Sequence, residues 1–424
     1  MSSPLSVPVS MLSSKRSRSR DSAKSSAGLS AASTMSLDPS DTESPRKQQE
    51  MDTEGKQPPL PAFLRQTRSG SAEIHSKFVN LEWQQRNRLA LGANLDADPP
   101  SQWARVTGED VIKRNRYMNV DPYLSNRIKL KVPEGHSDYI NASPIFLRQT
   151  RSGTEKNFIA TQGPKEGSHS HIYRMLWHET SSPAVIVMLT QTHEAGKEKC
   201  FQYFPHSLES PTLVINENDE FEDGFICTVT LVSITEDAAT RSTIRELEVK
   251  ITTGETKTIW HLLFAGWPDF LVPEGEERTA LLHLIDLSAS KNAPGSPRVV
   301  HCSAGVGRSG TFIALDWLLA ELAEGSLDEV PDEDDPIADV VDKLRMQRMM
   351  MVQGEAQFWF LYDVVKDLWI ERWRQKNDLS APAPVDSRAG EGEASGSGGE
   401  RERGTKFAKL EALEAEMRMN VERL

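Results

Sequence analysis

The stretch Pro297-Arg-Val-Val-His-Cys-Ser-Ala-Gly-Val-Gly-Arg-Ser-Gly-Thr311 contains a short apolar run, a loop of small residues and the start of a long apolar segment. This order predicts a strand, a glycine-containing turn and a helix. Successive backbone N–H groups of such a loop can bind one tetrahedral anion, and the positive end of the helix adds to the attraction. Arg308 supplies a planar guanidinium that can bind two oxygens of a phosphate. The stretch therefore predicts an anion-binding loop.

Cys302 lies at the mouth of this predicted loop. Nearby N–H donors, a helix N-terminus and a guanidinium all stabilise a thiolate, so we expect Cys302 to be a nucleophile at neutral pH. A lone cysteine is more often a buried and inert side chain. Here the thiol coincides with the predicted anion site, and this pairing is suited to phosphoryl transfer to sulfur.

The residues from His301 to Gly310 match, without departure, the signature loop of the protein tyrosine phosphatases, and the stretch resembles that family. The resemblance implies that Cys302 attacks phosphorus while Arg308 binds the phosphoryl oxygens. It also implies that His301 tunes the thiol and that the Ser309 hydroxyl helps the sulfur to leave. The substrate phosphate would lie against the remaining loop residues, Ser303, Ala304, Gly305, Val306 and Gly307.

The polar segment 113–123 resembles the substrate-recognition loop of the tyrosine-specific members of that family. The resemblance implies that Tyr117 stacks on the phenyl ring of the substrate and makes the cleft deep, with Val120 as a further substrate-binding residue. Asn119 stands where the family usually has an aspartate that binds the peptide backbone. Because asparagine cannot make that charge-assisted hydrogen bond, we expect weaker or differently selected peptide binding.

The segment 267–269, Trp-Pro-Asp, follows a predicted strand and resembles the mobile lid of the family. Asp269 lies between two aromatic residues, where desolvation favours the protonated carboxyl that a general acid needs. The resemblance implies that Asp269 protonates the leaving phenol oxygen and later accepts a proton from water, and that Phe270 contacts the substrate. Leu271 replaces a glycine that the family usually has, so we expect altered lid stiffness and turnover.

Two further loops of the family have counterparts here, and the resemblance assigns the remaining site residues to them. Glu194 would hold Arg308 in place, and Lys199 would contact the loop that carries the general acid. Further along the chain, Gln353 would position the hydrolytic water, with Gln357 assisting it.

Composition excludes several other classes of function. The formal net charge of −13 argues against nucleic-acid binding, because that interaction needs a positive surface. Three cysteines without a Cys-x-x-Cys pair, and no secretory leader, indicate a reducing compartment. No apolar run is long enough for a transmembrane helix. We therefore expect a soluble, cytoplasmic protein. A monomer is a separate expectation. The basic run 15–20 is interpreted as a nuclear address, a kinase target or simply a solvated segment.

The chain of 424 residues divides by composition into four predicted parts. Residues 1–75 are rich in serine, proline and charge, which predicts a disordered tail. Residues 76–376 should form the catalytic domain, and the resemblance implies a highly twisted mixed β-sheet with helices on both faces. Residues 377–400 predict a flexible linker, and residues 401–424 an amphipathic helix. The tails are candidates for binding regulators.

The octapeptide Phe-Leu-Arg-Gln-Thr-Arg-Ser-Gly occurs at 63–70 and again at 146–153. Two copies do not make a repeat fold, which needs at least three stacked units. A docking peptide, a phosphorylation site and an accidental duplication all remain open interpretations of the octapeptide.

Together the motifs predict a phosphatase that hydrolyses phosphotyrosine in proteins through a cysteinyl-phosphate, in intracellular signalling. No metal or cofactor is expected, because the loop amides and Arg308 supply the positive field that a metal ion supplies elsewhere. A dual-specificity or lipid phosphatase is one alternative, which Tyr117 disfavours because those enzymes generally lack the recognition loop. A catalytically weak module that traps phosphotyrosine proteins is the other, and Asn119 and Leu271 keep it open. Mitogen-activated protein kinases are candidate substrates by family analogy alone.

Overall fold

An eight-stranded mixed β-sheet forms the centre of the computed structural model, which describes residues 58–65, 72–94, 98–268 and 271–377. The strand order is β1-β2-β10-β3-β9-β8-β7-β6, and β10 runs parallel to both of its neighbours. The other parallel pair is β3 with β9, and the remaining pairs are antiparallel. The strands are β1 (Ala142–Arg148), β2 (Glu155–Thr161), β3 (Ala184–Met188), β6 (Thr212–Ile215), β7 (Cys227–Asp237), β8 (Ser242–Ile251), β9 (Thr256–Phe264) and β10 (Arg298–His301).

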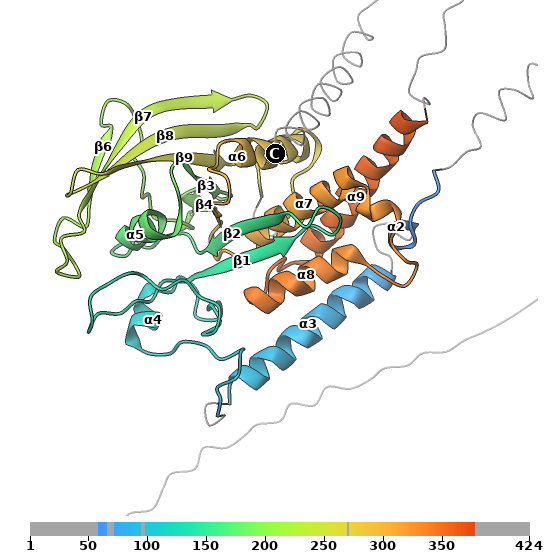
Figure 1. Ribbon diagram of the computed structural model, residues 1–424, viewed down its shortest axis with the longest axis horizontal. Helices are drawn as coiled ribbons and strands as arrows, with labels where there is room; N and C mark the ends of the chain where they lie inside the picture. Colours follow the sequence, from blue (N-terminus) through green and yellow to red (C-terminus); the bar gives the residue numbers. More distant parts are fainter. Residues whose placement is uncertain (1–57, 66–71, 95–97, 269–270, 378–424) are drawn as a thin grey trace, which may run out of the picture. The chain divides into compact units, whose positions relative to one another are not determined.

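Helices cover both faces of this sheet. Figure 1 shows α3, α7, α8 and α9 gathered together, with α5 apart from them across the strands. A short separate hairpin is formed by β4 (His193–Glu194) and β5 (Lys197–Glu198). The helices are α2 (Ala62–Arg65), α3 (Ala72–Gly92), α4 (Glu109–Arg114), α5 (Ser170–Glu179), α6 (Gly275–Ser290), α7 (Gly307–Glu324), α8 (Pro336–Gln347) and α9 (Glu355–Lys376), with a 3₁₀ turn at Ser326–Asp328.

Two hydrophobic clusters lie on opposite faces of the sheet, as the alternation of side chains along β3 shows. Val185 and Val187 belong to the cluster that includes α3, α6, α7, α8 and α9. Ala184, Ile186 and Met188 belong to the cluster that includes α5. Because successive strand residues point to opposite faces, a strand buried on both faces is apolar throughout. The predicted mixed sheet with helices on both faces is confirmed.

The folded part begins earlier than the predicted boundary at residue 76. Phe63 and Leu64 in α2 are buried in the same hydrophobic cluster as Ile74 and Leu81 of α3, and α3 itself begins at Ala72. The predicted tail 1–75 is therefore too long, because two apolar residues among polar neighbours gave too weak a periodicity to indicate burial. From residue 378 on, the predicted linker and C-terminal helix lie outside the described residues. None of the described helices is long and apolar enough to cross a membrane.

Candidate active site

The predicted anion-binding loop lies where the carboxyl ends of three parallel strands meet. Strand β10 lies between β2 and β3, and the loop follows it directly and leads into α7. The side chain of Cys302 is buried, and its Sγ accepts a hydrogen bond of 3.3 Å from the N–H of Gly305. Gly305 has a φ of +72°, and a Cβ there would lie 2.1 Å from the carbonyl oxygen of Thr161. Only glycine fits at this position, because the loop is pressed against the end of β2.

Arg348 fixes the outer side of the loop. This fully buried side chain donates to the carbonyl oxygens of Gly305 (2.9 Å) and Ala304 (3.2 Å), and to Oδ1 of Asn141 (2.7 Å). Because C=O and N–H point in opposite directions across a planar peptide, holding the oxygen of Ala304 outward turns the N–H of Gly305 toward Cys302. Burial lowers the pKa of Arg348 to about 10, which leaves it charged at neutral pH. Arg348 was not among the predicted site residues.

Arg308 at the start of α7 is held by a carboxylate from the β4–β5 hairpin. Its Nη1 and Nη2 lie 2.6 Å and 2.8 Å from the two carboxylate oxygens of Glu194, and Nη1 also donates to the carbonyl oxygen of Leu189. Burial alone would raise the pKa of Glu194, but hydrogen bonds from Arg308 and Thr190 outweigh it and hold that pKa below its ordinary value. This bidentate pair fixes the plane of the guanidinium.

The predicted recognition residues differ in their surroundings. The hydroxyl of Tyr117 lies 2.8 Å from Oγ of Ser303, which itself donates to the carbonyl oxygen of Lys199. Tyr117 therefore stands at the rim of the anion-binding loop. Val120 is buried in the hydrophobic cluster that includes α3, α6, α7, α8 and α9. Asn119 is exposed to solvent.

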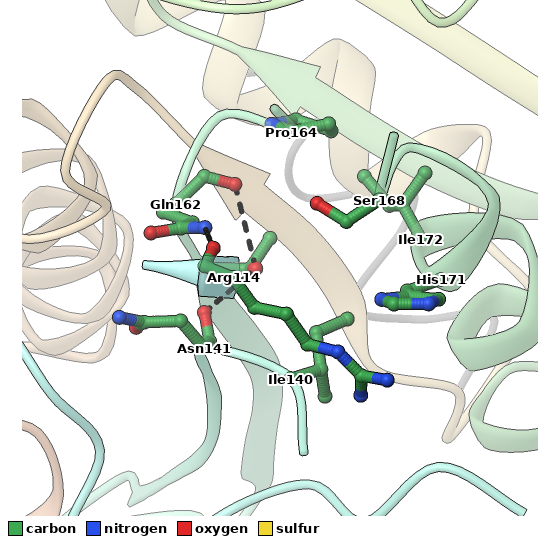
Figure 2. A pocket seen from close by; sticks show the side chains of 9 residues that line it. Arg114, Ile140, Asn141, Gln162, Pro164, Ser168, His171 and Ile172 are labelled. Atoms are coloured by element: carbon green, nitrogen blue, oxygen red, sulfur yellow. Dashed lines mark hydrogen bonds between the residues drawn. The ribbon is translucent and has the colours of Figure 1, made fainter. Parts of the chain in front are cut away.

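Gln162 positions the recognition loop, although it was not among the predicted site residues. Its Oε1 accepts from the N–H of Arg116 (2.8 Å), and its Nε2 donates to the carbonyl oxygen of Arg114 (2.7 Å). Figure 2 shows Gln162, Asn141 and Arg114 around a polar cavity of about 20 Å³, which His171 also lines. A cavity of this size holds about one water molecule. The only sequence signal was the turn 161–164, Thr-Gln-Gly-Pro, which separates the strand from α5.

His301 belongs to a buried chain of hydrogen bonds behind the loop. Its Nδ1 lies 3.1 Å from the carbonyl oxygen of Cys302, and its Nε2 lies 2.7 Å from the hydroxyl of Tyr203. That hydroxyl also lies 3.1 Å from Nε2 of His261. Burial lowers the pKa of His301 to about 4, so the ring is neutral at neutral pH. With Nδ1 donating to the Cys302 carbonyl, Nε2 must accept from Tyr203, whose oxygen accepts in turn from His261.

Both predicted glutamines adjoin the C-terminal end of the loop. A Cβ on Gly307 would lie 3.0 Å from Oε1 of Gln357 and 3.4 Å from Cβ of Gln353. Gln357 is buried and accepts from the N–H of Gly354, whereas Gln353 is exposed. The hydroxyl of Ser309 is buried, and it has no hydrogen-bond partner within the described part of the chain. These groups surround the same short stretch of backbone.

The lid segment is described only in part. Trp267 is buried beside Phe360, and its Nε1 donates to the carbonyl oxygen of Leu271 (3.0 Å). Asp269 and Phe270, the predicted general acid and its neighbour, lie outside the described residues. Leu271 is 59% exposed. Within the described ranges, no cluster of His, Cys, Asp and Glu could hold a metal ion.

Comparison with known proteins places this site in a family. Residues 111–367 match the family described as Protein-tyrosine phosphatase. Tyrosine-protein phosphatase 2 of Schizosaccharomyces pombe is 37% identical over 301 residues, which are 70% of this chain and 39% of that protein. Tyrosine-protein phosphatase 1 of Saccharomyces cerevisiae is 34% identical over 332 residues, 73% of this chain and 97% of that protein. Phosphatidylinositol phosphatase PTPRQ of Rattus norvegicus is 36% identical over 281 residues, 65% of this chain and 10% of that protein.

A solved structure shares the fold. PTPN18 in complex with HER2 phosphopeptides superposes with a TM-score of 0.58 at 26% identity, covering 73% of this chain and 98% of that one. The chain thus spans well under half of one fission-yeast relative and nearly all of one budding-yeast relative. On its sequence match and its fold, the chain belongs to the protein-tyrosine phosphatase family of hydrolases.

Proposed function

We propose that this chain hydrolyses phosphotyrosine in proteins by a two-step reaction at Cys302. The supporting observation is that Cys302, the loop amides, the Arg308–Glu194 pair and Tyr117 converge on one point at the end of β10. A nucleophile and an anion receptor serve attack on phosphorus, and an aromatic rim can stack on the phenyl ring of an aryl phosphate.

In the first step, the thiolate of Cys302 attacks phosphorus, an S–P bond forms, and the bond from phosphorus to the phenolic oxygen breaks. The loop N–H groups and Arg308 bind the three equatorial oxygens, whose charge is stabilised in this water-poor site. Asp269 gives its proton to the leaving phenolic oxygen, so that a neutral tyrosine departs.

In the second step, water attacks the cysteinyl-phosphate and the S–P bond breaks. Gln353 positions that water, with Gln357 holding the adjacent backbone, and Asp269 accepts the proton that the water loses. The orphan hydroxyl of Ser309 supports this step, because it can donate a hydrogen bond to the departing thiolate.

Selectivity for tyrosine is proposed to come from Tyr117. Its ring is partly buried against the hydrophobic cluster that includes α3, α6, α7, α8 and α9, and its hydroxyl is bonded to Ser303. A ring fixed at the rim deepens the cleft, so that a short phosphoserine side chain would not reach the sulfur. Hydrolysis of phosphoinositides is a second candidate function, because a relative that shares 36% identity is named a phosphatidylinositol phosphatase.

We further propose a monomer that acts in the cytoplasm, with access to the nucleus. The cysteines Cys200, Cys227 and Cys302 are all free thiols, which fits a reducing compartment. Protein substrates carrying phosphotyrosine, among them mitogen-activated protein kinases by analogy, and regulators of the tails are the proposed partners.

The test is hydrolysis by the full chain, with a metal chelator present. Peptides carrying phosphotyrosine, phosphoserine or phosphothreonine are compared with short-chain phosphoinositides. We expect turnover of phosphotyrosine alone, abolished by Cys302→Ser. Asp269→Ala should slow the departure of tyrosine, so that the phosphotyrosine peptide stays bound to the enzyme. Preference for the lipid, or turnover that survives Cys302→Ser, would overturn the proposal.

A further inference from the structure

The β4–β5 hairpin contacts two arginines that come from different loops of the site. On β4, both carboxylate oxygens of Glu194 bind Arg308. On β5, Oε1 of Glu198 lies 3.0 Å from Nη2 of Arg116. One arginine belongs to the anion-binding loop and the other to the recognition loop. The hairpin therefore connects the two loops through a pair of glutamates.

Arg116 is fixed in the protein and is not available to a substrate. Its side chain is only 9% exposed. It donates to the carbonyl oxygens of Gly163 (3.1 Å), Pro164 (2.6 Å) and Glu198 (3.3 Å). Two of these acceptors, the carbonyl oxygens of Gly163 and Pro164, lie outside the hairpin, so they hold Arg116 in place independently of Glu198. The backbone carbonyl and the carboxylate of Glu198 both bind this anchor, so the carboxylate is the side-chain part of the contact that docks the hairpin onto Arg116.

The hairpin needs such an anchor because it is small. Its two paired positions are His193 with Glu198 and Glu194 with Lys197, joined by a turn in which both residues have positive φ. An isolated two-stranded ribbon is at best marginally stable in water. Its geometry must therefore be set by contacts with the rest of the protein, and the Glu198–Arg116 pair is one of them.

These contacts connect the recognition loop, the anion-binding loop and the hairpin to one another around the site. Arg116 directly precedes Tyr117, whose hydroxyl bonds to Ser303 of the anion-binding loop. Ser303 in turn donates to the carbonyl oxygen of Lys199, the residue after Glu198. The recognition loop thus meets the anion-binding loop directly, through Tyr117, and indirectly, through the hairpin.

We propose that Glu198 is a positioning residue: by docking the hairpin onto Arg116, it sets where Glu194 presents Arg308 relative to Tyr117. This inference rests on the proposed function. Loss of the carboxylate leaves Glu194 bound to Arg308 but lets the pair move together, so that Arg308 aligns less well with the phosphoryl oxygens in the transition state. Such misalignment lowers kcat, because it removes stabilisation that is needed as charge shifts.

The size of the effect follows from exposure. Glu198 is 40% exposed in this pair, and partly exposed ion pairs contribute modestly, so we expect a fall in kcat of about two- to fivefold. Salt should reproduce the loss in the wild type, because added ions screen an exposed pair. The Glu198→Gln variant, which lacks the pair, should respond less to salt.

A different role for Glu198 predicts different kinetics. An exposed carboxylate near the cleft could instead contact basic residues of a substrate peptide. In that case, Glu198→Gln would raise KM for the peptide and leave a small aryl phosphate unaffected. Positioning of Arg308 affects both substrates alike, because both carry the same phosphoryl group.

The experiment compares the full-length wild type with Glu198→Gln, Glu198→Asp and Lys197→Gln. Lys197 is an exposed residue of the same hairpin and serves as the matched control. For each protein, kcat and KM are measured with a phosphotyrosine peptide and with p-nitrophenyl phosphate, at low and high salt, together with inhibition by vanadate. Thermal unfolding checks that the folded population is the same.

We expect Glu198→Gln to lower kcat for both substrates and to weaken vanadate inhibition by a similar factor. Glu198→Asp should partly restore both quantities, and Lys197→Gln should leave them at the values of the wild type. Unchanged kcat with the small substrate, or an effect confined to the KM of the peptide, would overturn the inference. If the wild type turned over neither substrate, the proposed function would fail. Equal vanadate affinity of wild type and Glu198→Gln would then separately refute the positioning of Arg308.

Discussion

Buried arginines position the anion-binding loop from two sides of its backbone. Arg308 is bound to Glu194 and to a backbone carbonyl, which leaves its plane fixed before any substrate arrives. Arg348 binds the outward carbonyl oxygens of the same loop. A site built this way needs little reorganisation when an anion binds, which is the property that electrostatic catalysis requires.

Replacing Glu194 tests how much this fixed plane matters. Glu194→Gln keeps the shape but removes one charge from a pair whose oxygens lie 2.6 Å and 2.8 Å from Arg308. Hydrogen bonds to charged groups contribute about 1.5–3 kcal/mol, and each 1.4 kcal/mol is about tenfold in rate. We therefore expect kcat/KM for a phosphotyrosine peptide to fall roughly 10- to 100-fold. Steady-state kinetics measure it, with Glu217→Gln, an exposed glutamate of another loop, as the control. A change of less than about twofold would contradict it.

Residues with a motif were predictable, and residues that act through the backbone were not. Glu194 and Arg308 came from the family resemblance, and the structure places them in contact. Arg348 and Gln162 bind mainly backbone atoms of distant segments. A backbone carbonyl carries no sequence signal, so these two roles become visible only once the chain is folded. Asp269 stays a prediction.

At the scale of elements, the duplicated octapeptide shows how far local sequence decides structure. Residues 63–65 of the first copy are helical, whereas 146–148 of the second lie in β1. Phe63 is buried, and Phe146 is 58% exposed. The first three residues of the second copy become strand because β2 pairs with them, and the rest of that copy forms the turn between β1 and β2. Central apolar strands such as β3 were predictable from composition, but identical residues in two surroundings were not.

Asp335 contacts three helices, α3, α8 and α9, and its removal should destabilise their packing. It caps α8 by accepting from the N–H groups of Ile337 and Ala338, and its other oxygen binds Lys77 of α3 and the hydroxyl of Tyr362 in α9. Loss of an N-cap costs about 1 kcal/mol, and each buried polar group left unpaired adds about 1–3 kcal/mol. We expect Asp335→Ala to lower the free energy of unfolding by roughly 2–4 kcal/mol.

Urea unfolding measures this change. The neighbouring Asp334 is exposed, so Asp334→Ala serves as the matched control and should stay within about 0.5 kcal/mol of the wild type. Equal losses in both variants would mean that the charge of the acidic segment 332–335, and not the contacts of Asp335, sets the stability.

At the scale of the whole molecule, the site and the core share one buried hydrogen-bond chain. His301 at the end of β10, Tyr203 after the β4–β5 hairpin and His261 in β9 come from three separate segments. Both imidazoles are fully buried. Burial lowers the pKa of His301 to about 4 and that of His261 well below its ordinary value. The chain therefore folds around two neutral histidines.

This arrangement makes folding stability depend on pH. Below about pH 6.5 the unfolded chain binds protons on both histidines, whereas the folded protein resists protonation until much lower pH. The unfolded state then binds more protons, so stability falls as pH decreases from about 6.5 toward 4. The shift of His301, from 6.5 to about 4, corresponds to roughly 3 kcal/mol over that range. His261 acts in the same direction.

Unfolding free energies measured in urea between pH 7.5 and pH 5 test this prediction, with two substitutions that assign the protons. His261→Gln removes one buried titrating group. When the pH is lowered from 6 to 5, the free energy of unfolding of this variant should therefore decrease by about 1.4 kcal/mol less than that of the wild type. His206→Gln removes an exposed histidine and should leave the slope unchanged. Because the comparison is between variants, carboxylates that titrate in the same range cancel. Parallel slopes for wild type and His261→Gln would show that His261 binds its proton as readily in the folded protein as in the unfolded chain, and the neutral state argued for His261 would then be wrong.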